Sequence, residues 1–441
     1  MRKKLVYSIF ILLTLLYSAY WIRYERASSS IKMIPKESSA AFQLNLRNVE
    51  KLFLFDVLKN PLLYTKKKDS LVINSERTSI FKLLNLPRNL IFYTTKSMED
   101  SIFYSENLVL KKPVIFKKQL ILNNYKNSKN TLGNTAIYSK NHHSFIIKED
   151  TIKIAIHLSK TFPINKSETI QFNPSNTIPV TSKFNFDPQA DFQCWNEKTG
   201  SYLGAFLNGK ITFSSDSVPA TLSQQTKQNN TIGYIHGNTR NIPFLSQQNT
   251  AINKAFKRLT NNSLDSINSY WDGALQLTLS SFKTITDSII SYDYDENFNQ
   301  IRKVKLQQRI VPNLHLNFGQ NSASKLWTYF KNNNTLKRVQ KDSVFTLIPM
   351  LPLKATLLNN TYYFYTDSIL KNPPPSLDEK GLHFFIDITQ IKENTTLEVF
   401  NHKQLQAVQS IKGNINRKHE LSIQINCNNP YRNGLIQLFK N

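Results

Sequence analysis

Residues 40–46 read AAFQLNL and pass directly into RNVEKL, so an alternating, strand-like run is followed at once by a helix-like one. A related pattern returns in GYIHGNTRNIPFL, residues 233–245. Under the shift that carries Asn45 onto Asn238, four positions are identical and one is conservatively changed. The positions Asn45, Arg47, Asn48, Val49 and Leu52 fall on Asn238, Arg240, Asn241, Ile242 and Leu245. This strand-to-helix unit predicts an internal repeat.

The later parts of the two halves have the same order of elements. Residues 114–125 (VIFKKQLILNNY) and 323–333 (ASKLWTYFKNN) each read as a helix, and each precedes β-branched and aromatic runs typical of hairpins. The run SIISYDYDENFNQIRKVKLQQRI, residues 288–310, favours antiparallel pairing rather than crossover connections. Each half is therefore expected to combine antiparallel strands with packed helices.

We predict an α+β fold made of two tandem repeats of mostly antiparallel sheet with packed helices, preceded by one N-terminal transmembrane helix. The first repeat covers residues 35–220 and the second covers residues 229–441. The polar run SQQTKQNN, residues 223–230, joins them. The alternative is one large β-rich domain in which the match between the halves is a coincidence of an Asn-rich composition.

Residues 1–30 predict a signal-anchor. Arg2, Lys3 and Lys4 precede an uncharged run, residues 5–22, whose helix would be about 27 Å long. That length nearly crosses a hydrocarbon core of about 30 Å, and no small-x-small cleavage site directly follows the run. The positive cluster predicts a single-pass inner-membrane protein with its amino terminus in the cytoplasm and its body in the periplasm. The alternative is secretion after signal cleavage.

The charge and the composition restrict the classes of function. Lys and Arg number 56 against 30 Asp and Glu, a net charge of +26, which favours anionic partners. Eleven glycines argue against a phosphate-cradling nucleotide site, and two cysteines exclude a disulfide framework or a Cys-based zinc module. No nucleic-acid partner is expected, because export separates the body from most nucleic acid.

A basic stripe is the candidate binding site. Lys303 and Lys305 share one face of a predicted strand, and Gln307 and Arg309 continue that face. Lys303, Lys305 and Arg309 could bind an anionic surface such as lipid phosphate. The ordinary alternative is a solvated sheet face or a charge-protected strand edge. Other lysine clusters occur at residues 66–68, 111–112 and 117–118.

Two groups of potential metal ligands are interpreted as turns. His142 and His143 are neighbours, which point to opposite faces of a strand, so we expect a hairpin turn there. Four alternating oxygen-bearing side chains resemble a calcium loop: Asp293, Asp295, Asn297 and Asn299. Such a loop needs Gly where this chain has Phe298 and Glu where it has Val304. We therefore predict no metal site.

The sequence contains no G-x-S-x-G, no H-E-x-x-H and no other complete catalytic motif. No catalytic residue and no cofactor are predicted, although dispersed Ser-His-acid sites leave an enzyme open as an alternative. Cys194 and Cys427 lie in strand-like segments of the two halves. We expect two buried free thiols, and a disulfide is the alternative that an exported compartment permits.

Ile34, Pro35 and Glu37, with the AAFQLNLRNVEKL that follows, resemble the start of the mature part of a family of uncharacterised envelope proteins of the Bacteroidota. These proteins are exported or membrane-anchored. The resemblance covers about twenty residues and implies an α+β envelope protein. It brings no catalytic residues with it.

The predicted function is a non-enzymatic, membrane-anchored periplasmic envelope protein that binds a partner protein or an anionic surface. Its predicted partners are an envelope protein or anionic lipid, with the N-terminal helix in the membrane. One alternative is a lipid or lipopolysaccharide carrier with an apolar cavity, because the many Phe and Tyr side chains could enclose an acyl chain. A second alternative is an enzyme that acts on envelope glycan or lipid.

Overall fold

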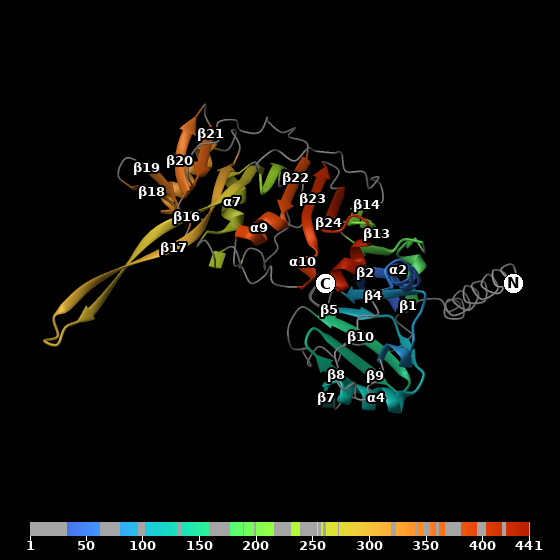
Figure 1. Cartoon of the computed structure of the whole chain (residues 1–441). Coiled ribbons are helices and arrows are strands. Elements are labelled where there is room, and N and C mark those ends of the chain that lie inside the picture. Colours follow the sequence, from blue (N-terminus) through green and yellow to red (C-terminus); the bar gives the residue numbers. More distant parts are fainter. Residues whose placement is uncertain are drawn as a thin grey trace, which may run out of the picture. The chain divides into compact units, whose positions relative to one another are not determined.

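The protein is described by a computed structural model (Figure 1). It describes residues 33–61, 80–95, 102–129, 135–157, 177–187, 189–197, 200–215, 231–238, 262–271, 273–318, 323–339, 342–346, 353–358, 361–366, 381–394, 403–416 and 420–440, with 254, 257, 258 and 351. The predicted signal-anchor and the predicted linker lie outside these residues. In the part of the chain that is described, no helix is long and apolar enough to span a membrane. The chain divides into two compact units between Ala205 and Phe206.

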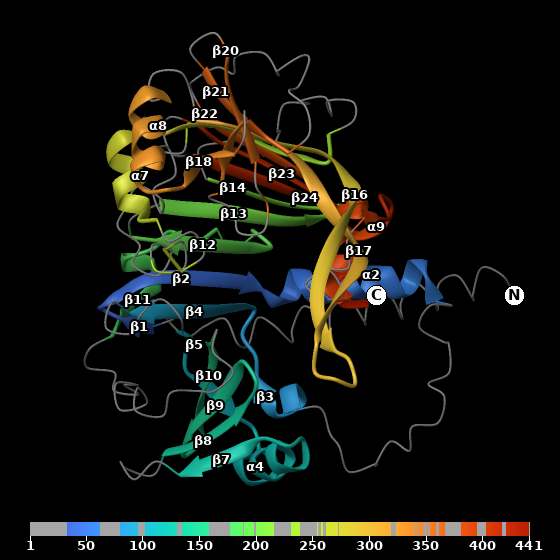
Figure 2. The same ribbon diagram turned by 90° about the vertical axis from the view of Figure 1, so that its left-hand side faces the viewer.

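The described part of the first unit contains an antiparallel sheet in the order β13–β12–β2–β4–β5–β10–β9–β8–β7, which Figure 2 shows from β13 to β7. β6 also pairs with β10, and β3 pairs with β6. The bounds are β2 Ser38–Asn45, β3 Leu84–Asn85, β4 Asn89–Thr95, β5 Ile102–Ser105, β6 Leu108–Leu110, β7 Lys126–Lys129, β8 Thr135–Lys140, β9 His143–Lys148, β10 Thr151–His157, β12 Phe192–Asn196 and β13 Gly200–Leu207.

Alternating side chains of this sheet build two cores. One core contains Tyr93, Tyr104 and Ile146, and it is covered by Ile34 of β1 (Met33–Pro35) and by residues near β11 (Thr177–Pro179). The other core contains Phe145 and Ile147 and is covered by α4 (Pro113–Leu122) and the short helix η1 (Ile80–Leu83). A second short helix, η4, spans Val180–Ser182.

The predicted strand-to-helix unit is present in the first unit. Asn45 ends β2, and its side-chain oxygen accepts a hydrogen bond from Asn48 N at 3.0 Å, which caps α2 (Leu46–Lys59). Asn is among the residues that most favour this position, because its side chain satisfies a backbone donor that the helix leaves unpaired. The helix begins where the sequence pattern indicates.

The described strands of the second unit also pair antiparallel, in the order β14–β24–β23–β22–β15–β16–β17–β21–β20–β19–β18. The strands span β14 Lys210–Ser215, β15 Gly233–Asn238, β16 Ala274–Tyr294, β17 Gln300–Asn317, β18 Leu336–Val339, β19 Asp342–Phe345, β20 Leu353–Leu358, β21 Thr361–Tyr365, β22 Gly381–Asp387, β23 Val408–Asn416 and β24 Leu421–Cys427. The helices span α7 Leu264–Tyr270, α8 Ala323–Asn332, α9 Ile388–Asn394, α10 Lys403–Gln406 and α11 Gly434–Lys440.

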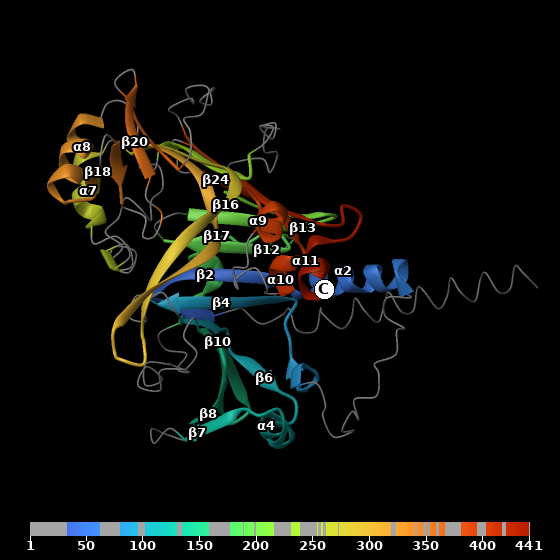
Figure 3. The same ribbon diagram turned by 60° about the vertical axis from the view of Figure 1, so that its left-hand side comes forward.

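An aromatic core holds this unit together where α7 and α8 lie side by side (Figure 3). Phe330 of α8 packs edge-on against Phe345 of β19 at 4.9 Å between ring centroids, and Phe345 lies 4.2 Å from Phe364 of β21. Tyr270 and Tyr329 join the two helices at 5.4 Å. Edge-on and tilted ring pairs of this kind stabilise a core beyond the area that they bury.

The two sheets have matching strand orders. β12–β2–β4–β5–β10–β9–β8–β7 of the first unit corresponds, strand for strand, to β22–β15–β16–β17–β21–β20–β19–β18 of the second. Asn45 and Asn238 end corresponding strands. The prediction of mostly antiparallel sheet with a few helices is confirmed.

Candidate functional site

The candidate residues Lys303, Lys305 and Arg309 all lie on the β16–β17 hairpin. Near its base, β16 pairs with β15 and β17 pairs with β21. From Ser281 to Asn313 the two strands pair with each other and with no other described strand. We call residues 281–313 the arm, which extends from its sheet as a long twisted ribbon (Figure 1).

The three predicted residues share one face of the arm, as the sequence pattern predicted. Two of them are paired with carboxylates of the opposite strand. Lys303 Nζ lies 2.6 Å from Asp293 Oδ2, and Arg309 forms an ion pair with Asp287. Lys305, opposite Ile289, makes no ion pair with the described residues. Two of the three cations of the predicted stripe are therefore paired with carboxylates of the arm itself.

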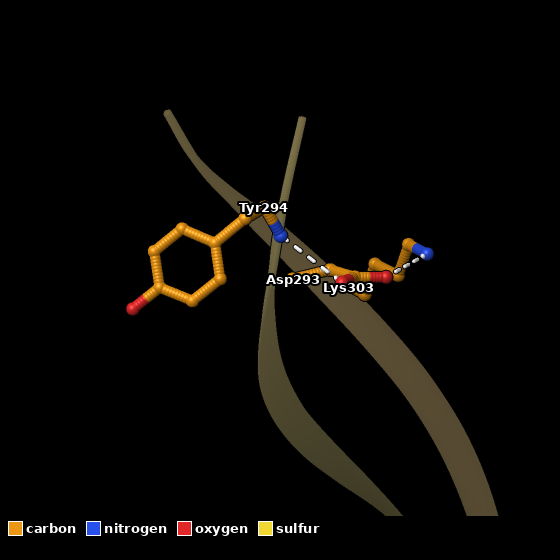
Figure 4. A network of polar contacts seen from close by, with 3 residues as sticks. All are labelled: Asp293, Tyr294 and Lys303. Atoms are coloured by element: carbon orange, nitrogen blue, oxygen red, sulfur yellow. Dashed lines mark hydrogen bonds and ion pairs between the residues drawn. The ribbon is translucent and has the colours of Figure 1, made fainter. Parts of the chain in front are cut away.

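Hydrogen bonds hold the carboxylates of Asp293 and Asp295 near the tip of the arm. Asp293 Oδ2 accepts from Lys303, and Asp293 Oδ1 accepts from Tyr294 N at 3.0 Å (Figure 4). The bond from Lys303 is the main cause that lowers the pKa of Asp293. Asp295 accepts from the backbone and side chain of Asn299 and from Asn297 N, and these bonds lower its pKa as well. The predicted hairpin turn at these residues is confirmed.

The opposite face of the arm is apolar and exposed. Cross-strand partners such as Ile290 and Val304 point to this side, and Leu306 is 69 % exposed. Arg302 is its one charged residue within the arm. We call the following set the apolar face: Ile290, Tyr292, Tyr294, Val304, Leu306 and Ile310. Exposed apolar patches of this kind mark interaction sites.

The tip adds one more exposed aromatic side chain. Phe298 lies in the turn with 86 % of its surface exposed and a φ of 61°. A side chain in this left-handed region costs about 1–2 kcal/mol relative to the ordinary conformations, and glycine or asparagine is the usual occupant. Because its backbone conformation is unfavourable and its ring is exposed, Phe298 contributes little to the stability of the fold.

Residues 287–309, the outer part of the arm, have no net charge, and Lys283 gives the whole arm a net charge of only +1. Between residues 287 and 309 it has four carboxylates, Asp287, Asp293, Asp295 and Glu296, and four cations, Arg302, Lys303, Lys305 and Arg309. Long-range attraction to an anionic surface is therefore weak at this site. The arrangement instead offers a twisted ribbon with one apolar face and with backbone groups along both edges, which suits contact with another protein.

The sequence analysis missed the apolar face. The signal was present, because apolar residues alternate at 290, 292 and 294 and again at 304 and 306. The same alternation fits a strand whose apolar side packs on a core, so the pattern alone does not tell a buried face from an exposed one.

The histidines of the first unit lie together without a metal-ligand set. Asn141 and His142 form the turn between β8 and β9, as predicted. His142 Nδ1 lies 3.2 Å from His157 O, and Tyr125 Oη lies 2.5 Å from His143 Nε2. Burial and the nearby Lys140 lower the pKa of His143. No group of three potential metal ligands occurs in the described part of the chain.

One ionisable lysine lies inside the first unit. Lys153 is buried, donates a hydrogen bond to Tyr93 Oη and lies 5.1 Å from the centre of that ring. Burial lowers the pKa of Lys153 to about 8. Burial also raises the pKa of Tyr93 and Tyr104. This cluster lies in the core, where it affects stability rather than a reaction.

Both cysteines are free thiols. Burial raises the pKa of Cys194 to about 11 and also raises that of Cys427. Thiols held in the protonated form react slowly with oxidants and electrophiles. The prediction of two free thiols is confirmed, but of the two only Cys427 is fully buried, and Cys194 is half-buried.

Comparison with known proteins provides no family. No family model matches the chain, and no curated protein matches it. Two solved structures of TP0453 show a weak likeness. Crystal form III has a TM-score of 0.19 and 10 % identity over 77 % of this chain and 90 % of that one. Crystal form I has a TM-score of 0.22 and 9 % identity over 77 % of this chain and 93 % of that one. Scores this low do not establish a shared fold.

Proposed function

We propose that this chain is a non-enzymatic, membrane-anchored envelope protein that binds a partner protein through the arm of the β16–β17 hairpin. The observation that carries the proposal is the exposed apolar face, which lies opposite a face whose charges are largely paired. A protein with a matching apolar strip would bury these side chains without leaving an unpaired carboxylate.

We further propose that the two units are tandem repeats, supported by their matching strand orders. The two units differ in the length of the hairpin at the position of the arm. Its counterpart in the first unit is the β4–β5 segment, residues 89–105, whereas β16 and β17 with their turn span residues 274–317. The same sheet is therefore built with a much shorter hairpin at this position. The extension is consistent with a role other than folding.

The anionic-surface alternative has weaker support at this site. Arg302 and Lys305 remain available to an anion, but the neighbouring carboxylates repel one. The lipid-carrier and enzyme alternatives stay predictions from the sequence. Binding through Lys303, Lys305 and Arg309 would require the Lys303–Asp293 and Arg309–Asp287 pairs to open.

The test is site-specific photo-crosslinking in native membranes. A benzophenone side chain replaces Leu306 on the apolar face, or its neighbour Gln307 on the charged face as the matched control. We expect one discrete protein adduct from position 306 and little from position 307. Equal adducts from both positions, or none from either, would refute binding through the apolar face. An adduct with lipid alone would favour a membrane surface over a protein.

A further inference from the structure

A second exposed surface lies on α4 of the first unit. Val114, Lys117, Lys118 and Ile121 recur at helix spacings of three and four, so they line one face of the helix. Val114 is 82 % exposed and Ile121 is 57 % exposed. The opposite side of the helix packs on the core through Phe116 and Leu120, which are fully buried. Lys118 is also exposed and Lys117 is half-buried, so Val114, Lys118 and Ile121 are not needed for packing within this unit.

This face of α4 is strongly basic. Lys111 and Lys112 directly precede the helix, and α4 contains no carboxylate. Lys111 Nζ donates to Lys82 O at 3.4 Å, which brings a further lysine beside the helix start. The adjoining β9–β10 turn contributes Glu149 and Asp150, so cations outnumber carboxylates here. We call Lys111, Lys112, Val114, Lys117, Lys118 and Ile121 the α4 face.

The start of α4 has Pro113 at its first position, which favours the helix backbone, but it has lysines where a helix favours carboxylates. Lys112 occupies the N-cap position and makes no side-chain capping bond, and the first turn has no acidic residue. A helix amino terminus carries a partial positive charge, so the two lysines beside it are electrostatically unfavourable. An anionic group bound at this end would relieve that repulsion.

The corresponding helix of the second unit, α8, has different residues at the positions of the α4 face. α4 and α8 end in the same way, because Asn124 and Asn334 both have positive φ. Aligned on these residues, the positions of Val114, Lys118 and Ile121 correspond to Ser324, Thr328 and Lys331. The fold therefore does not require the residues of α4 at these three positions.

We propose that the α4 face binds the surface of a bilayer that contains anionic phospholipid. The lysine ammonium groups would contact lipid phosphates, while Val114 and Ile121 enter the boundary of the acyl chains. Charge complementarity favours this occupant, because the helix presents cations and apolar side chains together with no carboxylate. The surface is distinct from the arm, so the proposal does not depend on the proposed protein partner.

The test uses the full chain and vesicles of phosphatidylcholine with or without phosphatidylglycerol. The variant Lys117→Gln/Lys118→Gln keeps helix-forming side chains and removes two charges. The matched control Lys325→Gln/Lys331→Gln removes two exposed charges from α8. A lysine near an anionic membrane contributes about 1 kcal/mol, so the α4 variant should lose roughly 30-fold in binding to the anionic vesicles. The control should bind like the wild type.

A local probe separates this surface from the rest of the chain. Val114→Cys is labelled with a polarity-sensitive fluorophore, and Thr328→Cys on α8 is the control, with labelled wild type as the background from the native cysteines. We expect a blue shift at position 114 on anionic vesicles, and none at 328. Wild-type binding by the α4 variant, an equal loss in the α8 control, or unchanged emission at 114 would each overturn the proposal.

Discussion

Lys303 Nζ lies 2.6 Å from Asp293 Oδ2 across the β16–β17 hairpin. The pair is diagonal, because the residue directly opposite Lys303 is Ser291. Arg309 and Asp287 repeat the same diagonal offset. These two pairs place a carboxylate beside Lys303 and Arg309, and the charged face of the arm stays well solvated. The arm can therefore remain in water on this side while the other side contacts a partner.

The exposed pairs should contribute little to stability. We expect Asp293→Asn and Asp287→Asn each to leave the free energy of unfolding nearly unchanged, because exposed ion pairs are screened by water and salt. Urea denaturation of the full chain measures this. The double variant also raises the net charge of the arm by two, yet the adduct from position 306 should persist. Loss of that adduct would show that the carboxylates take part in binding.

Phe298 should be dispensable for folding and important for binding. Phe298→Asn places a residue that tolerates positive φ in the turn, so the free energy of unfolding should stay the same or rise by up to about 1 kcal/mol. Hydrogen exchange of the arm amides reports this change. Cross-linking from position 306 should fall, because the exposed ring is gone. A destabilised arm would instead show that Phe298 supports the hairpin.

Features that depend on neighbouring residues were predictable from the sequence. The Asn45 cap and the turn at Asp295 form from side chains that bond backbone groups two to four residues away. The helix at α4 was also predicted, although its exposed face was not. Which side of α4 is buried depends on residues such as Phe145, which the chain brings to it from another segment.

Features that depend on distant pairing were not predictable. His236 lies directly opposite His383 because β15 pairs with β22, and no local pattern connects those two positions. Likewise, the predicted cations Lys303 and Arg309 are neutralised because the β16–β17 register brings each one to a carboxylate. A shift of that register by one residue would have placed the same lysines on the opposite face.

The matching ends of α4 and α8 predict matching effects. Asn124 and Asn334 have φ values of 63° and 55°, and in each case the next backbone N–H bonds back into the last turn, to Leu120 O and Phe330 O. Asn124→Ala and Asn334→Ala should each lower the free energy of unfolding by about 1 kcal/mol, while Gly should be tolerated at both positions. Denaturation of the four variants tests this. A large effect in one unit only would contradict the equivalence of the two helix ends.

Lys153 should make the first unit more stable in mild alkali. Its pKa is about 8 when folded and near its ordinary value of 10.5 when unfolded, so between these pH values the unfolded chain binds the additional proton. The free energy of unfolding should therefore rise by about 2 kcal/mol between pH 8 and 9.5. Above pH 10 the raised pKa of Tyr93 and Tyr104 reverses the trend, because the unfolded tyrosines ionise first.

Lys153→Met isolates this contribution, since it keeps an unbranched apolar stem and removes the titrating group. Urea denaturation at pH 7, 8 and 9.5 compares the variant with the wild type. We expect the rise to disappear in the variant, whatever its absolute stability. A rise of equal size in both proteins would mean that other groups cause it.

His236 should make the second unit sensitive to acid. The side chain is buried, and its Nε2 lies 3.3 Å from Thr278 Oγ1. Burial, and secondly the neighbouring His383, lower the pKa of His236 to about 4. Between that value and the ordinary value of 6.5, the unfolded chain takes up a proton that the folded chain does not. Stability is therefore fully present above pH 6.5 and falls as the pH approaches 4, by an amount on the order of 2 kcal/mol.

The substitution His236→Gln retains a polar side chain beside Thr278 and removes the titration. The variant should lose less stability than the wild type between pH 6.5 and pH 4.5. Hydrogen exchange locates the effect. The amides of β15 and β22 should lose protection in acid in the wild type and keep it in the variant. The amides of β8 and β9 are the control and should behave alike in both proteins. If β15 and β22 open at the same pH in both proteins, His236 is not the group that senses the acid.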